Sequence, residues 1–140
     1  MTLSMKNVSK VYKEGESQII ALDQVSMEVS SGEFVAIIGP SGSGKSTFLS
    51  IAGALLKPSQ GEVKIGNKNI ATLKDKELSH LRLQEIGFIL QTSNLMPYLN
   101  VLDNLLLLKK MSGKVTKQDE AFAKELLTGL GLTSKFKKFP

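Results

Sequence analysis

The residues best suited to chemistry form one uninterrupted stretch, Gly39-Pro40-Ser41-Gly42-Ser43-Gly44-Lys45-Ser46-Thr47. The stretch matches the phosphate-binding pattern Gly-x-x-x-x-Gly-Lys-Ser/Thr. Its glycines let the backbone turn amide groups toward phosphate oxygens, where a side chain would not fit. Lys45 would supply positive charge to the terminal phosphates, and the Ser46 hydroxyl would ligate a magnesium ion that bridges them. The stretch therefore predicts a binding loop for a nucleoside triphosphate.

The flanking segments have the order that such a loop requires. Residues 34–38 are apolar on both faces, which predicts a strand buried in a parallel sheet. A helix is predicted over 45–55, where the apolar residues Phe48, Leu49, Ala52 and Leu55 recur at helical spacing. Its positive N-terminal end would face the phosphates. The alternative is an ordinary strand-to-helix turn with a solvated lysine, but the Lys-Ser pair and the third glycine argue against it. We assign nucleotide binding to Gly39, Ser41, Gly42, Ser43, Gly44, Lys45, Ser46 and Thr47.

The other segments that precede residue 92 predict mainly strands. Strands over 3–12 and 19–29 would be joined by the turn-rich residues 13–17, and short strands over 62–65 and 69–70 would flank another turn. Together they predict an antiparallel β subdomain. Asp75 is a candidate N-cap for a short helix that buries Leu78 and Leu81, and residues 86–90 predict a further strand that ends before Gln91.

The last third of the sequence predicts helices. Asn100 can cap a strongly apolar helix that includes 105–108, and Thr116 can cap another whose apolar residues, Phe122, Ala123, Leu126, Leu127 and Leu130, precede Gly131. Residues 92–99 form the candidate boundary. We therefore expect a partial core with the antiparallel subdomain over 1–91 and a helical subdomain over 92–140.

Composition limits the classes of function. The 140 residues carry a net charge of +5, with 18 basic residues of which only Arg82 is an arginine. Scattered lysines and 6% aromatic content disfavour a nucleic-acid partner. The absence of cysteine excludes thiolate metal sites, and the single histidine, His80, fits a solvated helix position. No signal-peptide core or membrane-spanning run is evident, so we expect a cytoplasmic location.

A wider set of segments makes the sequence similar to one family. The segments are 8–12 (VSKVY), 22–26 (LDQVS), 32–38 (GEFVAII), the loop itself and 61–63 (GEV). This combination resembles the ATP-binding subunit of ABC transporters. Residues 81–91 (LRLQEIGFILQ) and 94–97 (NLMP) further resemble the branch of macrolide exporters, lipoprotein-release proteins and bacitracin-type transporters.

The resemblance implies two more site residues. Tyr12 corresponds to the aromatic residue that stacks on adenine in this family, although a tyrosine in a strand can also simply cover core. Gln91 corresponds to the Q-loop glutamine, which ligates magnesium or orients water. The loop that follows it would meet the membrane-spanning subunit. The resemblance also implies MgATP as the ligand, a second ATPase subunit as partner, and a location at the inner face of the cell membrane.

Three other motifs of the family do not occur in these 140 residues: the Leu-Ser-Gly-Gly-Gln signature, a Walker B strand that ends in aspartate and glutamate, and the switch histidine. Residues 137–140 resemble the segment that immediately precedes the signature. We therefore expect an incomplete P-loop α/β fold of the ABC ATPase type that lacks the later core strands, binds MgATP and hydrolyses it poorly. The alternatives are a noncatalytic fragment that competes for the membrane subunit, or another phosphate-loop phosphotransferase or GTPase.

Overall fold

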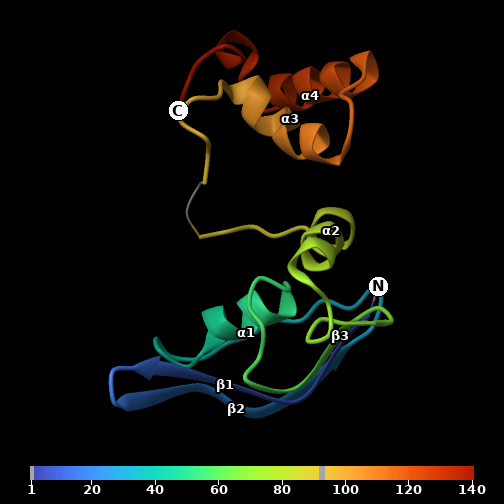
Figure 1. The fold of residues 1–140 in the computed structure, drawn as a ribbon. Helices are drawn as coiled ribbons and strands as arrows, with labels where there is room; N and C mark the ends of the chain where they lie inside the picture. Colours follow the sequence, from blue (N-terminus) through green and yellow to red (C-terminus); the bar gives the residue numbers. More distant parts are fainter. Residues whose placement is uncertain (1, 92–93) are drawn as a thin grey trace. The chain divides into compact units, whose positions relative to one another are not determined.

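The structure of the protein is a computed structural model that describes residues 2–91 and 94–140. The chain divides into two compact units, Met1–Phe88 and Ile89–Pro140, and Figure 1 labels their four α-helices and the strands β1, β2 and β3. Thr92 and Ser93, which begin the predicted boundary segment, lie outside the described residues. In the part of the chain that is described, no helix has the length and apolar character needed to cross a membrane.

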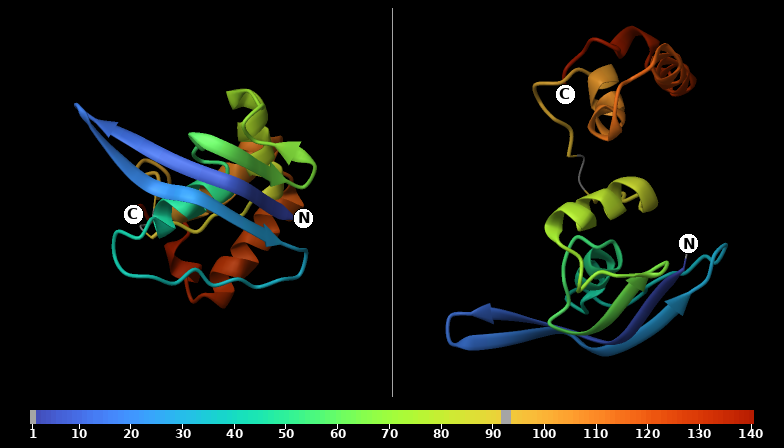
Figure 2. Two further views of the ribbon diagram at one scale, coloured as in Figure 1. Left: turned by 90° about the horizontal axis from the view of Figure 1, so that it is seen from below. Right: turned by 45° about the vertical axis from the view of Figure 1, so that its right-hand side comes forward.

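A four-stranded antiparallel sheet forms the base of the first unit, in the order β2-β1-β3-β4. The strands are β1 (Leu3–Glu14), β2 (Ser17–Val29), β3 (Gln60–Ile65) and β4 (Lys68–Asn69). β1 and β2 form a long twisted hairpin whose turn extends past the residues that pair with β3 (Figure 2). The predicted antiparallel subdomain is therefore confirmed.

Two helices pack on this sheet: α1 (Lys45–Ala52) and α2 (Asp75–Glu85). The buried cluster joins Met5 and Val63 of the sheet to Ile51 of α1 and Leu81 of α2. Each of these fully buried side chains contributes on the order of 1.5–3 kcal/mol by leaving water. α1 is shorter than predicted, and Leu49 on its outer side is exposed while Ile51 faces the core.

The start of α2 differs by one residue from the prediction. Lys74, not Asp75, is the N-cap, and Asp75 occupies the first helical position. The backbone amide of Lys74 donates to Oε2 of Glu77 at 2.8 Å, so the glutamate satisfies the free amide. Asp75 then lies in the first turn, where a negative charge is favourable.

Two predicted strands are absent from the described residues. Residues 34–38 and 86–90 are not part of any sheet, and the side chains of Phe34 and Ile38 are 95% and 91% exposed. A strand needs a neighbour that accepts and donates its backbone hydrogen bonds. The strands that the structure describes pair only with one another, so both predictions of a ladder strand are wrong for this chain.

The second unit consists of α3 (Val101–Ser112), α4 (Lys117–Gly129) and the short 3-10 helix η1 (Thr133–Lys135). Both predicted caps are confirmed. The amide of Asp103 donates to Oδ1 of Asn100 at 2.8 Å, and the amide of Asp119 donates to Oγ1 of Thr116 at 3.2 Å. The predicted apolar face of α4 is only partly buried, because Ala123 and Leu127 lie inside whereas Phe122, Leu126 and Leu130 are exposed.

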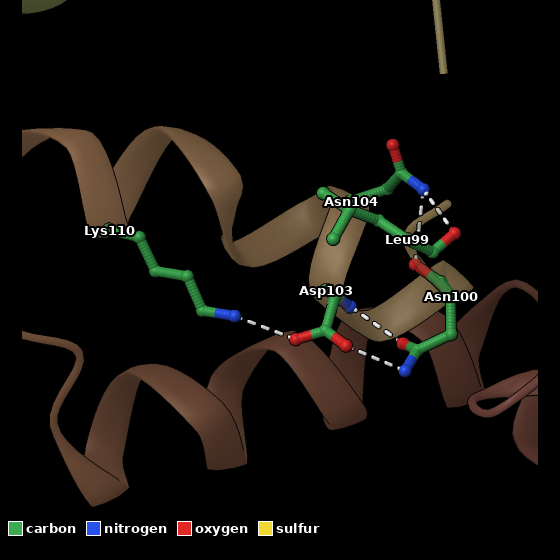
Figure 3. Close-up of polar contacts among 5 residues, drawn as sticks. All are labelled: Leu99, Asn100, Asp103, Asn104 and Lys110. Atoms are coloured by element: carbon green, nitrogen blue, oxygen red, sulfur yellow. Dashed lines mark hydrogen bonds and ion pairs between the residues drawn. The ribbon is translucent and has the colours of Figure 1, made fainter. Parts of the chain in front are cut away.

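Asn104 connects α3 to the turn that precedes it, as Figure 3 shows for the carbonyls of Leu99 and Asn100. Its Nδ2 also reaches the carbonyl of Met96 at 3.1 Å, and its Oδ1 accepts from the Met96 amide at 2.8 Å. One side chain thus holds both ends of the 96–100 turn on the first turn of α3.

Candidate nucleotide-binding site

Gly44 places the phosphate-loop motif at the start of α1. It is the N-cap of the helix with φ 85°, in the left-handed region, and its carbonyl accepts the first helical hydrogen bond from Phe48 at 2.8 Å. A Cβ atom here would collide with the carbonyl oxygen of Ala21 on β2 and lie 3.1 Å from Cδ2 of Leu22. Only glycine combines this backbone angle with this contact, so the loop packs directly against β2 at Gly44. We call this contact between Gly44 and the Ala21 carbonyl the seat of the loop.

Lys45 holds the loop in a closed shape. Its Nζ donates to the carbonyls of Gly39 and Pro40 at 2.8 and 2.6 Å, and lies 3.4 Å from Oγ of Ser43. The Ser43 amide donates to the carbonyl of Pro40 at 3.3 Å. The lysine therefore ties the beginning of the motif to its end.

A hollow of about 540 Å³ is lined by residues 41–47 alone, at the N-terminus of α1. Among the α-helices within 2–91 and 94–140, α1 differs from the other three in having no acidic residue in its first turn. No side chain caps its N-terminus either. Its first amides and its positive dipole end are thus left to an external anion. The residues of this loop fit a phosphate chain.

The three glycines of the loop differ in what surrounds them. A Cβ at Gly39 would lie 2.8 Å from Oγ of Ser43, a side chain that could give way, whereas Gly42 faces open space. Within the protein itself Gly42 is therefore constrained by its φ of 79° alone, and the expectation that a side chain there would obstruct bound phosphate stays a prediction. Ser41, Ser43 and Ser46 are exposed, and Thr47 is half-buried in the first turn of α1.

Ser46, the predicted magnesium ligand, is exposed and lines the hollow. Within residues 2–91 and 94–140, no group of three or more histidine or acidic side chains could hold a metal ion. Magnesium usually keeps several waters and binds through one or two protein oxygens together with phosphate oxygens. A hydroxyl in the first helical turn suits that mode of binding, and Ser46 as a ligand stays a prediction.

Tyr12 lies near the turn end of β1, opposite Ile19 of β2, and its side chain is 40% exposed. It belongs to the same unit as the loop. Nζ of Lys10 lies over its ring, 5.4 Å from the centroid. Gln91, by contrast, belongs to the second unit, where it is exposed and has no strand before it. Base stacking by Tyr12 and metal binding by Gln91 stay predictions.

Sequence reasoning missed two features of the first unit, the contact of Gly44 with the Ala21 carbonyl and that of Lys10 with Tyr12, and one feature of the second unit, the hydrogen bonds of Asn104 to the 96–100 turn. The Lys10–Tyr12 spacing of two residues on a predicted strand places both side chains on one face, so it carried a usable signal. The partners of Gly44 and Asn104 carry no such local pattern. His80 is exposed on α2, as expected.

The loop, its seat and the helix behind it define a phosphate-loop nucleotide-binding protein. Comparison with known proteins narrows the class, because the family described as "ABC transporter" matches residues 22–140. The chain belongs to this family. The ATP-binding protein HrtA of Staphylococcus epidermidis is 43% identical over all 140 residues, which cover 63% of HrtA. The macrolide export ATP-binding/permease protein MacB of Salmonella paratyphi A is 38% identical over 95% of this chain and 20% of MacB.

A solved structure confirms the type of fold. The ATP-binding cassette MJ0796 of Methanocaldococcus jannaschii, in a dimeric structure described as a post-hydrolysis state bound to ADP and Pi, aligns with a TM-score of 0.88 and 42% identity. The alignment covers 98% of this chain and 60% of that chain. The protein is thus a partial α/β domain of an ABC ATPase cassette, and it spans about 63% of the length of HrtA.

Proposed function

We propose that this chain is the ATP-binding portion of an ABC transporter ATPase and that it binds MgATP at residues 39–47. The hollow at the start of α1 carries the proposal, because its walls are the motif residues themselves and its helix end has no internal anion. In this proposal the loop amides and Lys45 hold the phosphates, Ser46 contacts magnesium, and Tyr12 receives the base. When bound, the metal would draw charge from the phosphate oxygens.

Weak hydrolysis is part of the same proposal. Phosphoryl transfer depends on positioning and on charges aimed at the developing transition state. No apolar run of this sequence leads into an aspartate-glutamate pair, so a Walker B carboxylate pair is not available from these 140 residues. Phosphate release at a rate typical of a complete ATPase would contradict this part of the proposal.

The partners follow from the family and from the exposed apolar residues of the second unit. We propose that the full protein pairs with a second ATPase subunit and, at the inner face of the cell membrane, with a membrane-spanning subunit. Leu95, Tyr98 and Leu108 are exposed in the region that follows Gln91, and large apolar residues on a surface often mark a protein interface. Gln91 and this region would form the contact with the membrane subunit.

The binding proposal is tested by titrating the chain with ATP in the presence and absence of Mg²⁺ and measuring the heat of binding. Lys45→Ala should weaken ATP binding at least tenfold, since the loop loses both its charge and its three internal contacts. Lys68→Ala is the matched control, because it removes the same charge from an exposed position on β4. Ser46→Ala should reduce the gain in affinity that Mg²⁺ provides. Equal affinity in the Lys45 and Lys68 variants would refute the proposed site.

The alternative of a noncatalytic interaction fragment makes a different prediction. A fragment that acts by occupying the membrane subunit would bind that partner equally well with and without Lys45. A nucleotide-dependent subunit would lose part of its partner affinity in Lys45→Ala. A GTPase would prefer guanine nucleotides over ATP in the same titration.

A further inference from the structure

Lys10 and Tyr12 form a contact that the nucleotide-binding loop does not require. They are two residues apart on β1, and Nζ of Lys10 lies 5.4 Å from the centroid of the Tyr12 ring. This distance lies within the range in which an ammonium group is attracted by the negative face of an aromatic ring. The cation covers one face of the ring.

The position of Lys10 is fixed by a distant part of the first unit. Its Nζ donates to the carbonyl of Lys57, in the segment that links α1 to β3, at 3.0 Å. The same segment holds the adjacent backbone: the amide of Ser59 donates to the carbonyl of Ser9 at 2.8 Å, and the amide of Val11 donates to Oγ of Ser59 at 3.1 Å. The hydrogen bond to the Lys57 carbonyl therefore anchors the ammonium beside the ring.

The contact lies on the side of the sheet that carries the phosphate loop. Lys10 pairs with Leu22 across the β1–β2 ladder, and directly opposed residues of an antiparallel pair project from the same face. Leu22 is the residue whose Cδ2 approaches Gly44. Lys10 and the ring that it covers thus lie on the face of the hairpin that carries Leu22. The Ala21 carbonyl that Gly44 contacts lies at the adjacent irregularity in the β1–β2 register.

We propose that Lys10 is a positioning residue for the nucleotide base. Its ammonium, anchored by the Lys57 carbonyl, holds the Tyr12 ring from one face and leaves the other face for a purine. Stacking a base on a ring that is already held costs less conformational entropy than stacking it on a mobile ring, because the tyrosine side chain is ordered beforehand. The proposal rests on the proposed function. It adds a contribution to ATP affinity that comes from binding of the base and not of the phosphates.

The test separates base from phosphates by comparing ATP with inorganic tripolyphosphate, which lacks the base and the ribose. Calorimetric titrations would use the parent chain, Lys10→Met, Lys10→Arg, Tyr12→Leu and the Lys10→Met/Tyr12→Leu double variant. We expect Lys10→Met to weaken ATP binding by roughly two- to fivefold, the size of an exposed cation–π contact, and to leave tripolyphosphate binding unchanged. Lys10→Arg keeps the cation and should restore ATP affinity. The double variant should bind ATP no more weakly than Tyr12→Leu.

Three outcomes would overturn the proposal. An equal loss for ATP and tripolyphosphate would show a general effect of charge, and additive losses in the double variant would show that Lys10 acts independently of Tyr12. Unchanged ATP affinity in Lys10→Met would remove the role altogether. A parent chain that binds neither ligand would instead refute the proposed function itself, and the role of Lys10 with it. Urea unfolding of each variant checks that the fold is retained.

Discussion

Replacing Gly44 by alanine should lower the free energy of unfolding more than the same change at Gly42. Both residues have a left-handed backbone, with φ of 85° and 79°. An alanine in this conformation costs about 1–2 kcal/mol. At Gly42 the added methyl group meets open space, so this is the whole expected loss. At Gly44 it collides with the Ala21 carbonyl, and the forced displacement of backbone adds about 1–3 kcal/mol.

Urea unfolding of the nucleotide-free chain measures the two losses without interference from bound phosphate. Gly42→Ala is the matched control, because it changes the same residue type in the same loop with the same backbone preference. We expect the unfolding free energy of Gly44→Ala to lie below that of Gly42→Ala by at least about 1 kcal/mol. Equal losses would refute the reasoning that β2 supports the loop through Gly44. A larger loss at Gly42 would show that the loop is held by other contacts.

Asn104→Ala should destabilise the second unit by about 1–3 kcal/mol and speed hydrogen exchange of the Met96 amide, whereas Asn104→Asp, which keeps the acceptor, should preserve that amide's protection. The backbone amide and hydroxyl of Thr116, with Lys109, lower the pKa of Asp119 from its usual 3.8 to about 2. Because this folded-state pKa is depressed, the contribution of Asp119 should be complete above about pH 4 and be lost as the pH falls through 2. Thermal unfolding should therefore show Asp119→Asn less stable than the parent at pH 7, with most of the difference gone near pH 2. Exposed Phe34 and Ile38 should promote self-association, so light scattering should report smaller species for a Phe34→Ser/Ile38→Ser variant; a monodisperse monomer of the parent chain would contradict this.

The parts of the fold that could be predicted from sequence are those determined by neighbouring residues. The caps Asn100 and Thr116 act on an amide three residues away, and the phosphate loop is complete within nine residues. The hairpin of β1 and β2 follows from two apolar strands around one turn. In each case the sequence pattern and the interaction that stabilises it cover the same short stretch, so the pattern is sufficient.

Segments whose state depends on a distant neighbour could not be predicted in this way. Residues 34–38 have the composition of a buried strand, but composition does not supply the hydrogen-bond partners, and in the described part of the chain the segment pairs with no strand. The exposure of Phe34 has the same cause. A hydrophobic pattern therefore predicts what a segment can become, while the presence of a partner decides whether a ladder forms.

The candidate site combines both kinds of determinant, and this division affects how its variants should be interpreted. The motif over 39–47 is local, but its seat is the Ala21 carbonyl, and the ring of Tyr12 is held through Lys10 by a carbonyl 47 residues further along the chain. Displacement of the 57–59 segment would move the ammonium away from the ring without touching the loop. Changes there should lower affinity for ATP and spare affinity for tripolyphosphate, whereas changes at Lys45 should lower both. The ratio of the two affinities thus identifies which half of the site a substitution has disturbed.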